Sequence, residues 1–232
     1  KTNSVTLNDF FTFTQSKAKA FSIGENFLLL CICKAVDART TFFTKQDFET
    51  LKQNNKKVYL FSAGQADNKF VLRYIQKGES EGIDKKYLTA CRTPWYSIEQ
   101  RPPSPIWVGV FNRTGLRFIR NEADVSNLTA FHCVYPQRNN LLFDIDIDSL
   151  FAYLLTNTAK KILTDNSREY GDGLQKFEPN DINKGMMLDL YQLQQSDKQE
   201  IVALYQHFRN SEQNELKYIN KIDPILNNYF MR

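Results

Sequence analysis

The chain has 232 residues and a mass of 27.1 kDa, which is enough for one large domain or two small ones. Its residues are 42% hydrophobic, yet the longest apolar run, Phe27 to Cys33, is far shorter than the roughly 20 residues that cross a bilayer. Neither a transmembrane helix nor a signal peptide is therefore expected. The net charge is only +4, but between Lys85 and Arg138 eight basic residues stand against three acidic ones, and such a local surplus attracts phosphate.

The four cysteines are too few and too scattered for a disulfide framework: Cys31, Cys33, Cys91 and Cys133. A zinc site needs close pairs of ligands, and the two histidines, His132 and His207, are isolated in the sequence. The sequence therefore predicts four reduced core thiols in a cytoplasmic protein and no metal site.

Short apolar runs separated by turn signals fill the first part of the chain and predict a strand-rich region. Strands are expected at Val5–Phe13, Phe27–Lys34, Val58–Phe61, Ile106–Val110, Leu116–Ile119 and Thr129–Tyr135. Short helices are expected at Lys45–Leu51 and at Asp67–Lys77, the second of which ends at Gly78. A turn is expected at Gln15–Lys19, and the segment FNRTG, with Gly115, predicts a hairpin turn.

Beyond about residue 140 the apolar spacing becomes helical. One helix is expected over four turns, with Asp146 or Asp148 as its cap, from the positions Ile147, Leu150, Phe151, Leu154, Leu155, Ile162 and Leu163. A second has Ile201, Leu204, Tyr205 and Phe208 on one face and a capping box at Ser196 and Gln199. A last helix, at Glu212 to Lys221, is expected to end near Pro224. The sequence thus predicts an α+β fold, strand-rich at residues 1–140 and helical at residues 141–232.

The segment from Arg92 to Pro136 combines two tryptophans, five arginines and a group of prolines. Arginine binds phosphate oxygens and forms bidentate hydrogen bonds to guanine, and asparagine forms them to adenine. These side chains are therefore candidates for DNA contacts. The prolines fix the backbone of an irregular loop, and Trp95 and Tyr96 either pack beneath that loop or stack on bases. In the alternative interpretation the arginines are solvated and the aromatics form the core of a sheet: Trp95, Trp107, Phe111, Phe118 and Phe131.

Neighbouring side chains on a strand point to opposite faces. Arg117 and Ile119 are therefore expected on one face of their strand, and Phe118 and Arg120 on the other. One of the two arginines then shares a face with the apolar residues of the sheet, so the arginines of this hairpin are not expected to be equivalent.

A series of motifs runs through the same stretch: Tyr87–Leu88, Arg92-x-Pro94-Trp95-Tyr96, a proline-rich turn at 102–105, Arg113, Arg120–Asn121 and Thr129-x-x-His132-x-x-Tyr135-Pro136. Two further segments flank this series: one that begins at Arg168, REYGDGLQKFEPND, and one that begins at Ile23, IGENFLLL. In this order they resemble the target-recognition region of DNA adenine methyltransferases of restriction–modification systems, in the subgroup whose catalytic domain precedes the recognition domain. Where that family has a Gly-rich turn, this chain has TQSKAKAFS.

The resemblance implies a sequence-specific recognition domain for double-stranded DNA at residues 1–140 and a helical closing or interaction segment at residues 141–232. The candidate DNA-binding residues are Arg92, Trp95, Tyr96, Arg101, Arg113, Arg117, Arg120, Asn121, Asn127, His132, Arg138 and Lys176.

The sequence carries no motif for the methyl transfer itself. Transfer to a flipped adenine needs an Asn/Asp-Pro-Pro-aromatic motif and a loop for S-adenosylmethionine, and the Pro-Pro pair here lies in RPPS at 101–104. The chain alone is therefore expected to hold no catalytic residue and no cofactor. Its expected partners are double-stranded DNA and a catalytic methyltransferase domain or subunit that binds S-adenosylmethionine, and no membrane.

Two other classes of protein remain open. The helical end suits a protein-interaction or specificity module of a multi-subunit restriction system. Glu215–Leu216–Lys217 has the letters of a restriction-endonuclease metal site, although that site needs a strand. Asp144, Asp146 and Asp148 are expected to cap a helix rather than to form a catalytic carboxylate pair.

The segment from Gly171 to Lys176 is expected to close the domain. Two glycines separated by one residue allow positive φ and a close approach of the chain to its neighbours. Phe177 is then expected to be buried and Lys176 to point outward, toward a DNA phosphate.

Overall fold

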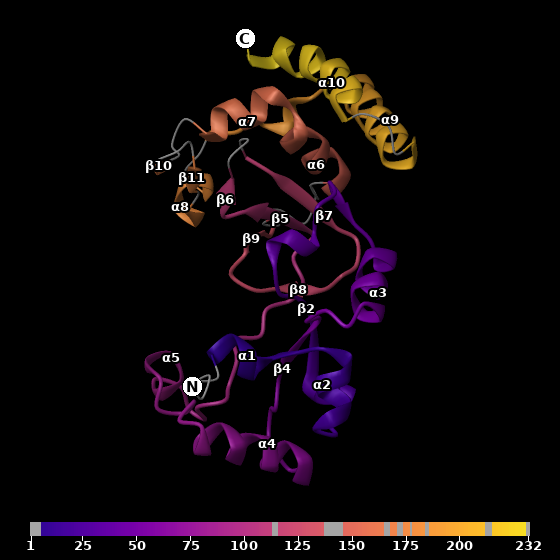
Figure 1. Ribbon diagram of the computed structural model, residues 1–232. Helices are drawn as coiled ribbons and strands as arrows, with labels where there is room; N and C mark the ends of the chain where they lie inside the picture. Colours follow the sequence, from indigo (N-terminus) through magenta and orange to yellow (C-terminus); the bar gives the residue numbers. More distant parts are fainter. Residues whose placement is uncertain are drawn as a thin grey trace. The chain divides into compact units, whose positions relative to one another are not determined.

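The computed structural model in Figure 1 describes residues 6–112, 116–136, 146–164, 168–170, 174–176, 178–183, 186–211 and 215–230. The chain forms two compact units. Unit 1 comprises residues 1–39, 43–103 and 123–128, and unit 2 comprises residues 40–42, 104–122 and 129–232. Both contain helices and sheets, so the predicted α+β class is confirmed. The predicted boundary at residue 140, between a DNA-recognition part and a helical closing part, stays a prediction.

Unit 1 is built on a four-stranded sheet with the order β1-β4-β2-β8. Its strands are β1 (Thr12–Phe13), β2 (Leu28–Ile32), β4 (Tyr59–Phe61) and β8 (Ser126–Asn127). The pairings of β4 with β1 and β2 are antiparallel, whereas β8 runs parallel to β2. Its helices are α1 (Leu7–Phe11), α2 (Gln15–Ala20), η1 (Glu25–Phe27), η2 (Ala35–Asp37), α3 (Lys45–Gln53), α4 (Lys69–Ser80) and α5 (Tyr87–Ala90).

The start of unit 1 differs from the prediction. The expected strand at Val5–Phe13 is mostly the helix α1, because Thr6 caps it by accepting a hydrogen bond from the Asp9 N–H at 3.0 Å. The expected turn at Gln15–Lys19 is the helix α2, which Thr14 caps in the same way. Such caps satisfy backbone donors that a short helix otherwise leaves open. The predicted β2, α3, β4 and α4 are confirmed, although α4 continues past Gly78 to Ser80.

Aromatic rings fill the core of unit 1. Tyr74 of α4 stacks on Phe10 with ring centroids 4.6 Å apart, and its hydroxyl donates to the Phe10 carbonyl at 2.6 Å. Phe61 and Trp95 lie around the same Phe10 ring, at 6.2 and 5.4 Å. Gly78 lies directly beneath this cluster, so α4 approaches the rings at a position without a side chain.

A methyl group at position 78 should overpack this core. An added Cβ would lie 2.6 Å from a Trp95 ring carbon and 2.7 Å from a Phe10 ring carbon. Overpacking costs about 1–3 kcal/mol, whereas helix propensity favours alanine by about 1 kcal/mol. We expect Gly78→Ala to lower the free energy of unfolding in urea by about 1 kcal/mol net. Ser80→Ala, at an exposed position of the same helix, should stay within about 0.5 kcal/mol of the parent. A Gly78→Ala chain more stable than the parent would contradict this packing.

Unit 2 is centred on the strand β5 (Ile106–Gly109). This strand pairs antiparallel with β7 (Phe118–Asn121) and β9 (Phe131–Val134), and β3 (Phe42–Phe43) follows β7 in the sheet order β3-β7-β5-β9. The predicted pairing of the two hairpin strands is confirmed, and Gly115 lies outside the described residues. Beyond the prediction, β6 (Phe111–Asn112) joins a second sheet with β11 (Leu174–Lys176) and β10 (Arg168–Tyr170).

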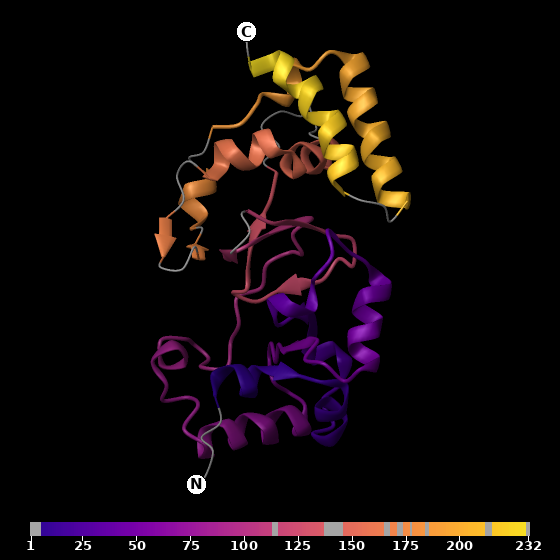
Figure 2. The ribbon, with the colours of Figure 1, turned by 45° about the horizontal axis from the view of Figure 1, so that its top comes forward.

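Helices cover one face of the β5 sheet. They are α6 (Ile147–Leu155), α7 (Asn157–Thr164), η3 (Leu190–Gln192), α9 (Gln195–Ser211) and α10 (Glu215–Phe230). The short helix α8 (Pro179–Asn183) lies by β10 and β11 in Figure 1. Figure 2 shows α9 and α10 side by side. The hydrophobic core between sheet and helices includes Ile106, Val108, Phe118, Phe151 and Tyr205.

Three expectations for these helices are wrong. The helix predicted from Ile147 to Leu163 breaks at Thr156, whose hydroxyl donates to the Tyr153 carbonyl at 2.7 Å and accepts from the Ala159 N–H. No capping box forms at Ser196, because α9 already begins at Gln195. The last helix continues through Pro224, since the buried side chains of its apolar face lie on both sides of the proline: Ile219, Ile222 and Leu226. The cap at Asp146 and the buried face of α9 at Ile201, Tyr205 and Phe208 are confirmed.

Candidate nucleic-acid interface

The aromatic part of the predicted interface is packed within unit 1. The Trp95 Nε1–H donates to Glu79 at 3.2 Å, and the Trp95 ring contacts Phe10. Arg92 donates to the Ser97 carbonyl at 2.9 Å, and its guanidinium lies 5.7 Å from the centre of the Phe11 ring. Both side chains therefore hold the proline-containing loop to α1 and α4, which favours the packing interpretation of Trp95. Tyr96 lies against Trp95 and is half-buried.

Arg101 has a different environment. Its guanidinium forms two hydrogen bonds with the carboxylate of Glu99, at 2.7 and 2.8 Å, and both side chains are exposed. An exposed ion pair contributes at most about 1 kcal/mol because water and salt screen it. A phosphate group can replace Glu99 at little cost, so Arg101 keeps the chemistry of a phosphate contact.

Arg120 points into the helical layer of unit 2. It lies opposite Ile106 in the β5–β7 register, as Phe118 lies opposite Val108, so the predicted sharing of a face by Phe118 and Arg120 is confirmed. Its guanidinium donates to the Pro105 carbonyl at 3.0 Å, and its Nε lies 3.8 Å from Asp148 of α6. Arg120 is therefore a link between sheet and helices in unit 2.

Further polar groups complete this link. Gln206 of α9 donates to Asp148 at 2.8 Å, and Arg209 binds the Glu122 carboxylate with its Nε at 2.6 Å. Burial raises the pKa of Asp148, and the neighbouring Arg120 opposes that rise. A partly buried carboxylate is stabilised by such a cation, because leaving a charge unpaired away from water is costly.

Arg117 is also partly inside unit 2. It donates to the Thr40 carbonyl at 3.3 Å, and burial lowers the pKa of its guanidinium. The two described arginines of the hairpin are not equivalent, as expected, but both have contacts within the fold.

The predicted adenine-reading amides serve the backbone. Asn121 is buried, and its Nδ2 donates to the Ser104 carbonyl at 2.8 Å. The Asn127 Nδ2 donates to the Leu128 carbonyl at 2.9 Å. Because the Asn121 amide is enclosed, a base edge cannot reach it in this conformation.

The remaining candidates lie in unit 2 or outside the described residues. His132 is half-buried on β9, opposite Val108. Lys176 pairs with Glu178 at 2.5 Å, and its ammonium lies 5.9 Å from the Phe111 ring centre. The structure does not describe Arg113, Arg138, the two glycines at 171 and 173, or Phe177. The candidates Arg92, Trp95, Tyr96, Arg101 and Asn127 belong to unit 1, whereas Arg117, Arg120, Asn121, His132 and Lys176 belong to unit 2.

The nuclease-like tripeptide lies on a helix. Glu215, Leu216 and Lys217 begin α10 rather than a strand. The Glu215 carboxylate accepts from the Thr41 hydroxyl at 2.8 Å and lies 3.6 Å from the Lys160 ammonium. In the described part of the chain, no group of three or more His, Cys, Asp and Glu side chains is arranged to hold a metal ion. The four cysteines form no disulfide with one another, and the expectation of four core thiols is wrong for Cys91, which is exposed.

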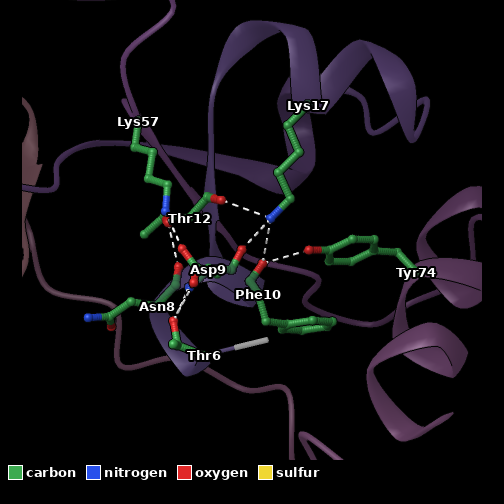
Figure 3. A network of polar contacts seen from close by, with 8 residues as sticks. All are labelled: Thr6, Asn8, Asp9, Phe10, Thr12, Lys17, Lys57 and Tyr74. Atoms are coloured by element: carbon green, nitrogen blue, oxygen red, sulfur yellow. Dashed lines mark hydrogen bonds and ion pairs between the residues drawn. The ribbon is translucent and has the colours of Figure 1, made fainter. Parts of the chain in front are cut away.

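The sequence analysis did not predict the polar network at the start of unit 1 that Figure 3 draws. The Lys17 ammonium donates to the carbonyls of Asp9, Phe10 and Thr12 at 2.5, 3.0 and 2.9 Å. It thereby closes the carbonyl end of α1, and burial lowers the pKa of Lys17 to about 8. Lys17 belongs to the segment TQSKAKAFS, so the residues that replace a Gly-rich turn have a structural role here. Thr6 and Thr14, which cap the starts of α1 and α2, were the signal in the sequence that could have predicted these two helices.

The carboxylate in this network should make acid stability depend on Asp9. Hydrogen bonds from Lys57 and then Thr6 lower the pKa of Asp9 to about 2, below its ordinary value of 3.8. Its contribution to stability is therefore fully present above pH 3.8 and is lost as the pH falls toward 2. Because Asp9 is exposed, we expect a difference below about 1 kcal/mol. Urea unfolding between pH 2 and 5 should show a shallower acid loss for Asp9→Asn than for the parent, and parallel curves would contradict the assignment.

Comparison with known proteins places the chain in the class of Type II methyltransferase C-terminal domains. It belongs to the family of the C-terminal domain of Type II methyltransferase M.Eco57I, whose model matches residues 4–226. Type II methyltransferase M.AccI of Acinetobacter calcoaceticus is 60% identical over 222 residues, which are 94% of this chain and 41% of M.AccI. Type II methyltransferase M.XamI of Xanthomonas campestris pv. amaranthicola is 31% identical over 111 residues, 48% of this chain and 20% of M.XamI.

A solved structure shares the fold. The type IIG restriction endonuclease BpuSI superposes with a TM-score of 0.52 at 12% identity, over 99% of this chain and 29% of BpuSI. The resemblance to methyltransferases of restriction–modification systems, inferred from the motifs between Tyr87 and Pro136, is thus confirmed by the family. None of the helices in the described ranges has the length and apolar character that a membrane span requires.

Proposed function

We propose that this chain recognises a specific sequence in double-stranded DNA on behalf of a Type II methyltransferase that modifies adenine at N6. The observation that carries the proposal is the family match over residues 4–226. The eight basic residues between Lys85 and Arg138 support it, because a local surplus of cations suits a phosphate backbone. The adenine specificity rests on the motifs from Arg92 to Pro136.

We assign the candidate residues to two roles. Arg101 and Lys176 are proposed to contact phosphates, since each forms an ion pair with a carboxylate two residues away, Glu99 and Glu178, which a phosphate group can replace. Arg117, Arg120 and Asn121 are proposed to hold the shape of unit 2, because their polar atoms bind its backbone. The other candidates for DNA contacts are Arg92, Tyr96, Asn127 and His132, with Arg113 and Arg138 outside the described residues.

Methyl transfer requires a second component. The motif that holds a flipped adenine is missing from these 232 residues, and M.AccI is more than twice as long as the matched region. We propose that S-adenosylmethionine and the catalytic residues belong to a methyltransferase domain or subunit that works with this chain. Purified residues 1–232 are then expected to bind duplex DNA without incorporating labelled methyl groups from S-adenosylmethionine.

Salt dependence tests the proposed function. The DNA affinity of the chain should fall steeply with salt, and Arg101→Ala should flatten the slope of log K against log salt by about 0.9, the value of one phosphate contact. Its thermal stability should not change, because the Arg101–Glu99 pair is exposed. Fluorescence anisotropy with a labelled duplex measures the slope.

Arg120→Met is the matched control. It removes the cation beside Asp148 and should lower the free energy of unfolding by about 1–3 kcal/mol, while the salt slope at a temperature where the variant is folded stays that of the parent. An Arg120→Met chain that loses one phosphate contact from its slope would contradict the assignment of roles. Salt-insensitive association, or methyl incorporation by the chain alone, would overturn the proposed function.

A further inference from the structure

The helix α5 presents an exposed apolar pair at its first two positions. Tyr87 is 82% exposed, the highest value among the exposed large hydrophobic side chains of the described residues, and Leu88 is 58% exposed. In Figures 1 and 2, α5 lies on the opposite side of unit 1 from α2. Apolar surface left in water forgoes the stabilisation of burial, so an adjacent exposed pair indicates an interaction site.

The backbone around this pair is firmly held. Ile83 and Thr89 on either side are fully buried. The Ile83 N–H donates to the Gly78 carbonyl at 2.9 Å, and the Thr89 hydroxyl donates to the Lys86 carbonyl at 2.9 Å. The turn is therefore anchored to α4, and the exposure of Tyr87 and Leu88 follows from the fold rather than from a loose segment.

The charge around the pair indicates what it binds. Lys85 and Lys86 directly precede it, and residues 84–92 contain three basic residues and one acidic residue. Two acids near the end of α4 already have partners in unit 1, since Glu79 accepts from Trp95 and Glu81, the C-cap residue, pairs with Lys77. Lysine is depleted in protein–protein interfaces, whereas cations beside an apolar side chain suit a nucleic-acid duplex.

We propose that Tyr87 and Leu88 form a wedge that enters double-stranded DNA and unstacks adjacent base pairs, with Lys85 and Lys86 on the flanking phosphates. Apolar side chains inserted in this way kink a duplex, and an aromatic ring stacks on the base that it uncovers. This inference rests on the proposed function and adds to it a defined distortion of the DNA.

The test uses the 232-residue chain and random-sequence duplexes that carry 2-aminopurine, whose fluorescence rises when the base is unstacked. The parent should bind with a rise in fluorescence. Tyr87→Ala should weaken binding by about fivefold or more and lose most of that rise, and Leu88→Ala should act in the same direction. Tyr87→Phe should behave as the parent, because stacking needs the ring and not the hydroxyl.

Two substitutions at exposed apolar positions of unit 2 serve as controls. Leu216→Ala matches Leu88, with 59% exposure, and Tyr191→Ala replaces a tyrosine that is 49% exposed. Both should leave affinity and fluorescence unchanged, and the melting temperatures of the two α5 variants should equal that of the parent.

The outcomes separate this inference from the proposed function. If the parent binds DNA and Tyr87→Ala binds equally well with the same fluorescence, the wedge is wrong and DNA recognition stands. If Tyr87→Ala binds more weakly but the parent gives no rise in fluorescence, Tyr87 touches DNA without unstacking it, and the wedge is again wrong. If Tyr87→Ala loses only its association with a separately produced methyltransferase domain, the pair is a protein-docking surface. A parent that does not bind duplex DNA overturns both proposals.

Discussion

The structure of unit 2 depends on one positive charge, the guanidinium of Arg120, which lies beneath the helices and needs acceptors there. It projects from the β7 strand toward α6, where it faces the carboxylate of Asp148. A guanidinium cannot be neutralised, so the helical layer has to supply acceptors for it. The contact of Gln206 with Asp148 and the pair of Arg209 with Glu122 extend the polar link to α9. These polar contacts therefore fix the position of the helices on the sheet, in addition to the packing of the apolar core.

In unit 1, too, cations hold parts of the fold together, and aromatic rings pack beside them. Lys17 closes the carbonyl end of α1, and its ammonium also lies 3.9 Å from the centre of the Phe13 ring. Arg92 lies over Phe11, and Trp95 packs against Phe10. Arg92 and Trp95, which look like part of a nucleic-acid surface in the sequence, therefore stabilise the fold of unit 1.

The sequence predicted the elements that depend on local patterns. The apolar run of β2, the spacing of α4 and the cap at Asp146 are signals within a few residues, and each appears in the structure. The helices α1 and α2 were missed because single threonine caps outweigh a weak alternation of apolar residues. Pro224 did not end α10, because the buried face of that helix continues beyond it.

The candidate site was harder to predict than the fold, because charge in a sequence does not reveal its partner. Glu122 and Arg209 are 87 residues apart and form a bidentate pair. Asn121 binds a carbonyl 17 residues away. Nothing in the local sequence distinguishes these side chains from Arg101, whose partner is two residues away and exposed. The class of protein followed from the order of motifs, whereas the role of each side chain required the tertiary contacts.

These contacts change the number of phosphate contacts that the proposed function can assign to the basic segment. Eight phosphate contacts would give a slope of log K against log salt of about −7. Arg117 and Arg120 bind carbonyls within unit 2. Each cation held in this way adds to the positive potential, which steers DNA toward the surface, but it releases no counterion from a phosphate. If the chain binds DNA as we propose, the electrostatic part of its affinity comes from fewer residues than the sequence suggests. Discrimination between sequences would then depend on side chains that reach the bases and on the energy needed to deform the duplex.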